Sequence, residues 1–96
     1  MSDPSGSKLS EDMAVSLHRQ FRFQWEPAQN SFVLLYPEGL IKLEGSAGEI
    51  MKRIDGTKTV SGIIADLEST FPGVDLRQDV IEFLEHAYDK GWIRQQ

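Results

Sequence analysis

Cysteine is absent from the 96-residue chain, and the only histidines are His18 and His86. The first absence excludes disulfide bonds, zinc–thiolate sites, iron–sulfur clusters and a thiol nucleophile. Because the two imidazoles lie far apart in the sequence, they form no spaced metal-binding motif either. We therefore expect no metal and no cofactor.

Long apolar runs and an excess of basic residues are also missing. No run approaches the roughly 18 to 20 apolar residues of a membrane-spanning helix, and the N-terminus lacks the apolar stretch of a signal peptide. Fifteen acidic residues against ten basic ones give a net charge of −5, which opposes binding to a polyanion such as DNA. The sequence thus predicts a cytoplasmic protein that binds neither membranes nor nucleic acids.

Ordinary catalytic machinery is missing as well. A chain of this size buries only about 60 to 65% of its extended surface, so a deep catalytic cavity would compete with the core for apolar side chains. No serine lies in a nucleophile motif, and no glycine-rich phosphate loop is present. We expect a protein that is not an enzyme.

The first 18 residues offer little that could be buried. Pro4, Gly6 and the serines at positions 2, 5, 7 and 10 lie among charged residues, and only Val15 and Leu17 look able to dock on a core. This composition predicts a flexible tail at 1–18 and one folded domain at 19–96.

Three short segments after the tail have the pattern of strands. Between 19 and 26, aromatic residues alternate with polar ones, as in a half-buried strand. The run 32–36 is apolar throughout, as in a central strand. The residues Pro37-Glu38-Gly39 then predict a tight turn into a third strand at 40–43.

Beyond residue 45 the apolar period changes from two to about 3.6, which predicts helices. Three are expected, at about 46–54, 59–71 and 75–90, each ended by a glycine-containing turn. Their capping signals are Ser46 with Glu49, Thr59, and Asp75 with Gln78. The remaining Trp92-Ile93 is either a closing strand or a docked tail.

Three strands followed by three helices predict an α+β domain. The expected architecture is a winged helix-turn-helix-like fold, with a three-stranded antiparallel sheet followed by a three-helix bundle. Folds of this kind often place their last helix in the major groove of DNA. Between Asp75 and Lys90, however, five acidic residues outnumber two basic ones, so this helix would repel phosphate. DNA binding is therefore a disfavoured alternative.

Two features favour a peptide as the partner. The strand at 40–43 is the last of the sheet, and an unpaired edge can accept an added strand. The last helix carries an apolar arc about 160° wide, whereas a surface helix needs only a little over 100°. The extra width has two explanations: contact with both a sheet and a neighbouring helix, or a flank that walls a peptide groove. Lys42 can also protect the edge from unwanted pairing.

A family resemblance is carried by FVLLYPEGLIKL at 32–43, SAGEI at 46–50 and IDG at 54–56. Later segments agree in order and spacing: Thr59-Val60 with Ile63-Ile64, Phe71-Pro72, Asp79-Val80 with Phe83-Leu84, and Gly91-Trp92-Ile93. Over residues 19–93 the chain resembles pyrroloquinoline quinone biosynthesis protein D, the PqqD family. The most specific piece is LYPEG at 35–39.

The resemblance implies a recognition element for ribosomally made, post-translationally modified peptides (RiPPs), a small domain without catalytic activity. Members of the family bind the precursor peptide PqqA as an added strand and present it to the radical SAM enzyme PqqE, which cross-links a Glu and a Tyr of the peptide. The implied role is a peptide chaperone or adaptor in pyrroloquinoline quinone (PQQ) biosynthesis. The expected peptide-binding residues are Leu40, Ile41, Lys42 and Leu43 on the edge strand, and Arg77, Val80, Ile81 and Leu84 on the last helix.

Three questions stay open at the level of sequence. Arg77 could pair with a carboxylate of the peptide or with an internal one such as Asp79 or Glu38. A leader-peptide recognition element of another RiPP pathway is an alternative function. A monomer is the simpler expectation for the oligomeric state, with a strand-exchanged dimer as the alternative.

Overall fold

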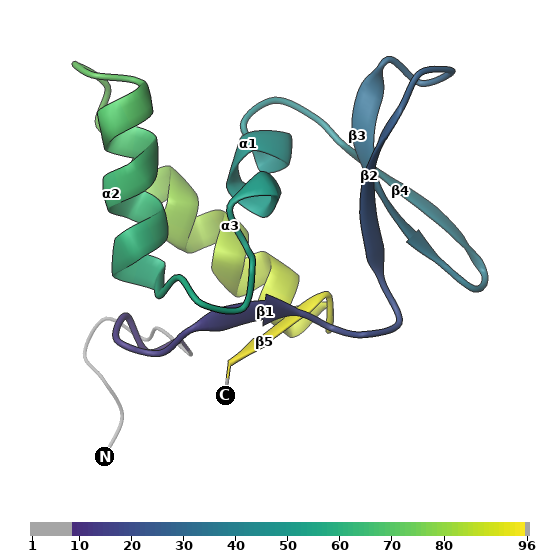
Figure 1. The fold of residues 1–96 in the computed structure, drawn as a ribbon, viewed down its shortest axis with the longest axis horizontal. Coiled ribbons are helices and arrows are strands. Elements are labelled where there is room, and N and C mark those ends of the chain that lie inside the picture. The colour runs from purple at the N-terminus through teal and green to yellow at the C-terminus, as the bar shows by residue number, and fades with distance from the viewer. Residues whose placement is uncertain (1–8, 96) are drawn as a thin grey trace.

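A computed structural model describes residues 9–95, and its helices and strands fall into two groups (Figure 1). The helices lie together on one side, and a three-stranded sheet stands on the other. A two-stranded ribbon made from both ends of the described chain runs beneath the helices. The elements are β1 (Val15–Leu17), β2 (Arg22–Glu26), β3 (Ser31–Tyr36), β4 (Gly39–Leu43), α1 (Ala47–Lys52), α2 (Val60–Thr70), α3 (Arg77–Asp89) and β5 (Ile93–Gln95).

The three-stranded sheet is antiparallel and has the order β2-β3-β4. Its register aligns Phe23 with Leu34 and Leu34 with Ile41, so apolar side chains of all three strands share one face. The pair Tyr36–Gly39 closes a two-residue turn at Pro37-Glu38. The predicted α+β class, with a three-stranded antiparallel sheet followed by three helices, is confirmed.

The predicted tail is wrong for residues 9–18, whereas residues 1–8 lie outside the described part of the chain. Strand β1 pairs with β5, with Val15 opposite Gln95 and Leu17 opposite Ile93. Val15 is fully buried, and Leu9 is almost so. The reason is non-local: these isolated apolar residues find their partners at the far end of the sequence, where no local pattern reveals them. Of the two expectations for Trp92-Ile93, the closing strand is the one observed, and it begins at Ile93.

Of the three helix caps predicted from the sequence, only the one at Thr59 forms as predicted. Oγ1 of Thr59 accepts a hydrogen bond from the amide of Gly62 at 3.0 Å, as predicted for the start of α2. Ser46 makes no side-chain capping bond at α1. At α3, Oδ1 of Asp75 accepts from the amide of Arg77, and the amide group of Gln78 donates to Glu82 instead of completing a capping box.

A single apolar core joins the sheet, the helices and the β1–β5 ribbon. It is built from Leu9, Val15, Leu34, Leu43, Ile50, Met51, Val60, Ile63, Ile64, Leu67, Val80, Leu84, Ala87 and Ile93. Within residues 9–95, no helix is both long and apolar enough to cross a membrane. In the same part of the chain, no cluster of three or more His, Asp or Glu side chains is placed to hold a metal ion.

Candidate functional site

Strand β4 is an edge strand, as its place in the sequence predicted. Among the described residues, β3 is the only strand that pairs with it. In an antiparallel hairpin with a two-residue turn, the closing pair is hydrogen-bonded and the pairs alternate from there. The backbone N–H and C=O groups of Ile41 and Leu43 therefore form hydrogen bonds to β3. The backbone N–H and C=O groups of Leu40 and Lys42 point outward, where an added strand would bind.

The β4 side chains divide between the two faces of the sheet. Ile41 and Leu43 turn toward the core, Ile41 half-buried and Leu43 buried. Leu40 is 40% exposed, and Lys42 is also exposed. The edge thus combines two outward-facing backbone positions with one exposed apolar side chain, which is an unusual feature to leave open to water.

Two of the four α3 residues expected to contact a peptide lie inside the core. Val80 is 1% exposed and Leu84 is fully buried. Both belong to the same core cluster as Leu43, so α3 and β4 are joined through packing. The side chain of Leu84 is therefore part of the core and is not exposed to a peptide.

The other two lie on a flank of α3 that the N-terminal segment covers. Ile81 and Arg77 line a small hollow together with Leu9 and Glu11. Arg77 donates to the carboxylate of Glu11, which settles its internal partner as neither Asp79 nor Glu38. Contact with the N-terminal segment on this flank therefore explains much of why the apolar arc of α3 is wider than a surface helix needs.

The segment at 9–13 is itself held in place by Gln95. The side-chain amide of Gln95 donates to the carbonyl oxygens of Ser10 and Met13, and its Oε1 accepts from the amide of Ser10. The amide of Ser61 also donates to the carbonyl of Glu11. The chain's own N-terminal segment thus occupies the surface on which the sequence analysis placed part of the peptide.

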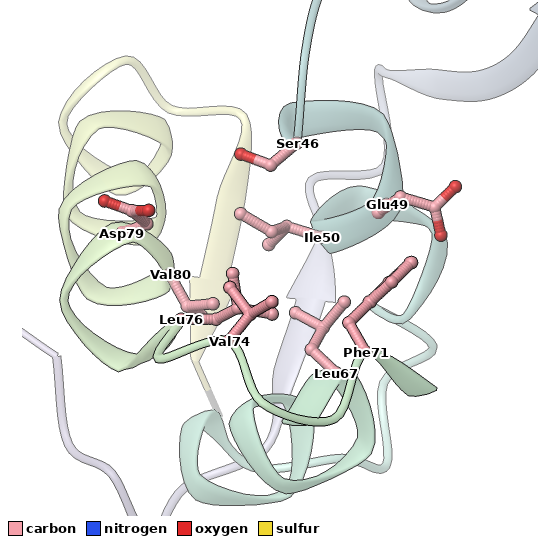
Figure 2. Close-up of a pocket in the computed structure, with 9 residues that line it drawn as sticks. All are labelled: Ser46, Glu49, Ile50, Leu67, Phe71, Val74, Leu76, Asp79 and Val80. Atoms are coloured by element: carbon pink, nitrogen blue, oxygen red, sulfur yellow. The ribbon is translucent and has the colours of Figure 1, made fainter. Parts of the chain in front are cut away.

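The opposite flank of α3 borders an apolar pocket of about 300 Å³. Figure 2 shows side chains of α1, the end of α2, the α2–α3 turn and α3 converging around it. The hydroxyl of Ser46 lies at its edge, and the carboxylate of Glu49 points away. The lining residues are Ser46, Glu49, Ile50, Leu67, Phe71, Val74, Leu76, Asp79 and Val80.

Sequence reasoning missed this pocket except for Val80. Phe71 and Val74 flank the Pro72-Gly73 turn, whose sequence predicts only the end of a helix. In the structure Phe71 is 40% exposed and Val74 52% exposed. Turns are usually polar, so two large apolar residues in this one are the feature of the sequence that could have indicated a binding surface.

One residue of the pocket lining is close in sequence to the end of the edge strand. Leu43 ends β4, and Ser46 at the pocket is three residues further along the chain. A strand added to β4 that continues past Leu43 advances about 3.3 Å per residue, so three further residues span about 10 Å. The described structure therefore offers a backbone edge and an apolar cavity whose lining begins three residues further along the chain.

Comparison with known proteins identifies the family. The family model described as Coenzyme PQQ synthesis protein D (PqqD) matches residues 31–93. Two relatives bear the name "PqqA binding protein". The one from Stutzerimonas stutzeri is 48% identical over 88 residues, covering 91% of this chain and 96% of the relative. The one from Azotobacter vinelandii is 53% identical over 78 residues, covering 80% and 85%.

Two solved structures share the fold. The solution NMR structure of the PqqD truncation of Methylobacterium extorquens PqqCD, described as a functional and stand-alone RiPP recognition element, has a TM-score of 0.74 and 27% identity. It matches over 92% of this chain and 96% of its own. The crystal structure of PqqD from Xanthomonas campestris has a TM-score of 0.50 and 29% identity, over 86% and 94%. With the family model and these relatives in agreement, the chain belongs to the PqqD family of coenzyme PQQ synthesis proteins.

Proposed function

We propose that this protein is a peptide-binding adaptor in PQQ biosynthesis, and that it binds the precursor peptide PqqA as a strand added to β4. The observation that carries the proposal is the open edge at Leu40 and Lys42 in a chain whose relatives are named for binding PqqA. Family membership favours this pathway over another RiPP pathway.

Main-chain pairing supplies the attraction, and side chains supply the selectivity. The outward N–H and C=O groups of Leu40 and Lys42 bond to the peptide backbone in any sequence. The peptide's own side chains then alternate between the two faces, one row beside exposed Leu40 and the other toward half-buried Ile41. After the cost of ordering a flexible chain, we expect an affinity between micromolar and nanomolar, about −8 to −12 kcal/mol.

The eight residues expected from the sequence take different parts in this proposal. Leu40, Ile41, Lys42 and Leu43 form the pairing edge, and Val80 reaches the peptide at the apolar pocket. Leu84 acts from within the core. Arg77 and Ile81 contact the peptide only if the segment around Leu9 and Glu11 moves aside.

The adaptor role also includes a partner enzyme. We propose that the bound peptide is presented to the radical SAM enzyme PqqE, and that a monomer performs this task because the β4 edge must be free. A larger PqqCD protein is the source of the Methylobacterium extorquens domain, which is described as functional by itself. A pull-down of PqqE by this protein, with and without PqqA, tests the presentation step.

The strand-addition proposal is tested by calorimetric titration of PqqA into Lys42→Pro and Lys42→Ala. Proline removes the outward amide and is tolerated on edge strands, whereas alanine keeps that amide and removes only the charge. We expect Lys42→Pro to raise Kd at least about tenfold and Lys42→Ala to change it little, because a lost pairing bond and a displaced strand exceed 1.4 kcal/mol. Equal affinities for the two variants would exclude β4 as the acceptor.

A further inference from the structure

The pocket beside α3 has the chemistry of a side-chain receptor. Its lining is almost wholly apolar, and its volume of about 300 Å³ lies at the lower end of the range for ligand pockets, roughly 300–1,000 Å³. A cavity of this kind suits one or two apolar side chains, because a cofactor would need more polar partners. The exposed edges of Phe71 and Val74 extend the apolar surface outward from it.

The surroundings of the pocket carry negative charge. Asp79 lies at its α3 side, and Glu82 is within about 60° of Asp79 on the helical wheel. On the α1 side, the guanidinium of Arg53 is already paired with Glu49 at 2.9 Å and with Asp66 at 3.2 Å. An occupant that brings a cation to Asp79 would be electrostatically complementary to this side of the mouth.

We propose that the pocket binds an apolar side chain of the precursor peptide and that Asp79 contacts a lysine or arginine next to it in the peptide. This inference rests on the proposed function, since it extends the strand added to β4 toward Ser46. The β4 edge pairs with any backbone, whereas the pocket and Asp79 distinguish one peptide from another. Selectivity therefore resides beyond the paired stretch, at the α1–α3 side of the domain.

Blocking the pocket tests the apolar half of the proposal. Ser46 makes no side-chain capping bond, so Ser46→Trp places a large ring at the pocket edge without removing an interaction of α1. Ser69→Trp adds the same ring on an exposed position of α2, outside the pocket lining. We expect Ser46→Trp to raise the Kd for synthetic full-length PqqA about tenfold or more, the loss typical of one apolar anchor, and Ser69→Trp to leave Kd unchanged.

Phe71→Ala provides a second variant that removes a wall instead of filling the space. Its matched control is Tyr88→Ala, which truncates an equally exposed aromatic ring on α3, outside the pocket lining. Only Phe71→Ala should weaken binding. Thermal unfolding of each variant verifies that the fold is retained, and either pair of variants alone decides the question.

The charge half is tested with Asp79→Asn against Glu68→Gln, which removes one exposed carboxylate from α2 and so changes the net charge equally. We expect only Asp79→Asn to raise Kd, by about three- to tenfold at low salt, with a shallower dependence on ionic strength than the wild type. Each Lys and Arg of PqqA is then replaced with Gln, one at a time, and the Kd is measured for both the wild type and Asp79→Asn. We expect one replacement to raise the Kd for the wild type but not for Asp79→Asn, which is the coupling that a double-mutant cycle detects.

The outcomes separate the two proposals. If the wild type binds PqqA while Ser46→Trp and Phe71→Ala bind as tightly, the pocket is not the anchor, although strand addition to β4 stands. If Asp79→Asn and Glu68→Gln have equal effects, the cation is not recognised at Asp79. If the wild type does not bind PqqA, the proposed function itself fails, and this inference fails with it.

Discussion

The guanidinium of Arg77 at the start of α3 donates to the carboxylate of Glu11, which fastens the N-terminal segment to one flank of the helix. Gln95 reinforces the attachment through its hydrogen bonds to Ser10 and Met13. This flank of α3 is therefore covered from within the protein. The flank toward the apolar pocket is the one left for a partner.

The Arg77–Glu11 pair should contribute little to stability, because both side chains are about half exposed. We expect Arg77→Ala to lower the free energy of unfolding by less than about 1 kcal/mol in urea titrations, and high salt to reduce the difference. PqqA should bind this variant as tightly as the wild type if the peptide uses the other flank. A large loss of affinity would instead place the guanidinium against the peptide.

Gly48 in α1 lies where no side chain fits. A methyl group at this position would come within 2.8 Å of Cδ2 of Phe32, which joins α1 to β3. Gly48→Ala should therefore lower the free energy of unfolding by about 1–3 kcal/mol, as overpacking usually does. Gly62→Ala in α2 is the control, since its methyl group would meet Thr59 Oγ1 at 3.4 Å and should gain up to about 1 kcal/mol from helix propensity. Equal destabilisation of the two variants would argue against the α1–β3 contact.

Leu84→Ala and Leu40→Ala should separate stability from binding. Leu84 is fully buried, so its truncation should cost about 2–5 kcal/mol of unfolding free energy, measured by urea denaturation. Leu40 is 40% exposed and lies on the open edge, so its truncation should affect stability little and raise the Kd for PqqA. A loss of stability in Leu40→Ala together with weaker binding by a stable Leu84→Ala would contradict the placement of both residues.

Asp55 should make stability depend on pH. Hydrogen bonds from the amide and hydroxyl of Thr57, and from the amide and ammonium of Lys58, hold the pKa of this carboxyl well below its ordinary value near 3.8. A folded-state pKa below the unfolded one adds stability at neutral pH that is lost progressively as pH falls below about 4. The stability difference between the wild type and Asp55→Asn should therefore be largest at pH 7 and shrink toward pH 2 in urea titrations. A difference that grows on acidification would refute this.

The elements that follow a local pattern were predictable from the sequence. Strands β2 to β4, the long helices α2 and α3 and the cap at Thr59 each depend on residues within a few positions of one another. The edge position of β4 also followed, because the hairpin connections are short. These parts of the fold and the expected backbone site needed no information from distant residues.

What could not be predicted depends on contacts between distant residues. The pairing of Val15 with Gln95 joins the two ends of the described chain. The helical wheel indicates an apolar arc of about 160° on α3, but Leu9, which lies against one flank of it, comes from a segment of tail-like composition. For the same reason no local pattern points to Glu11 as the partner of Arg77.

The most direct test of strand addition is a titration of ¹⁵N-labelled protein with PqqA, followed by amide chemical shifts. The account predicts the largest shifts at residues 39–43 of β4 and around the pocket at Ser46 and Val74, with slowed hydrogen exchange of the outward amides of Leu40 and Lys42. Shifts confined to β1, β5 and the flank around Arg77, with β4 unchanged, would contradict it.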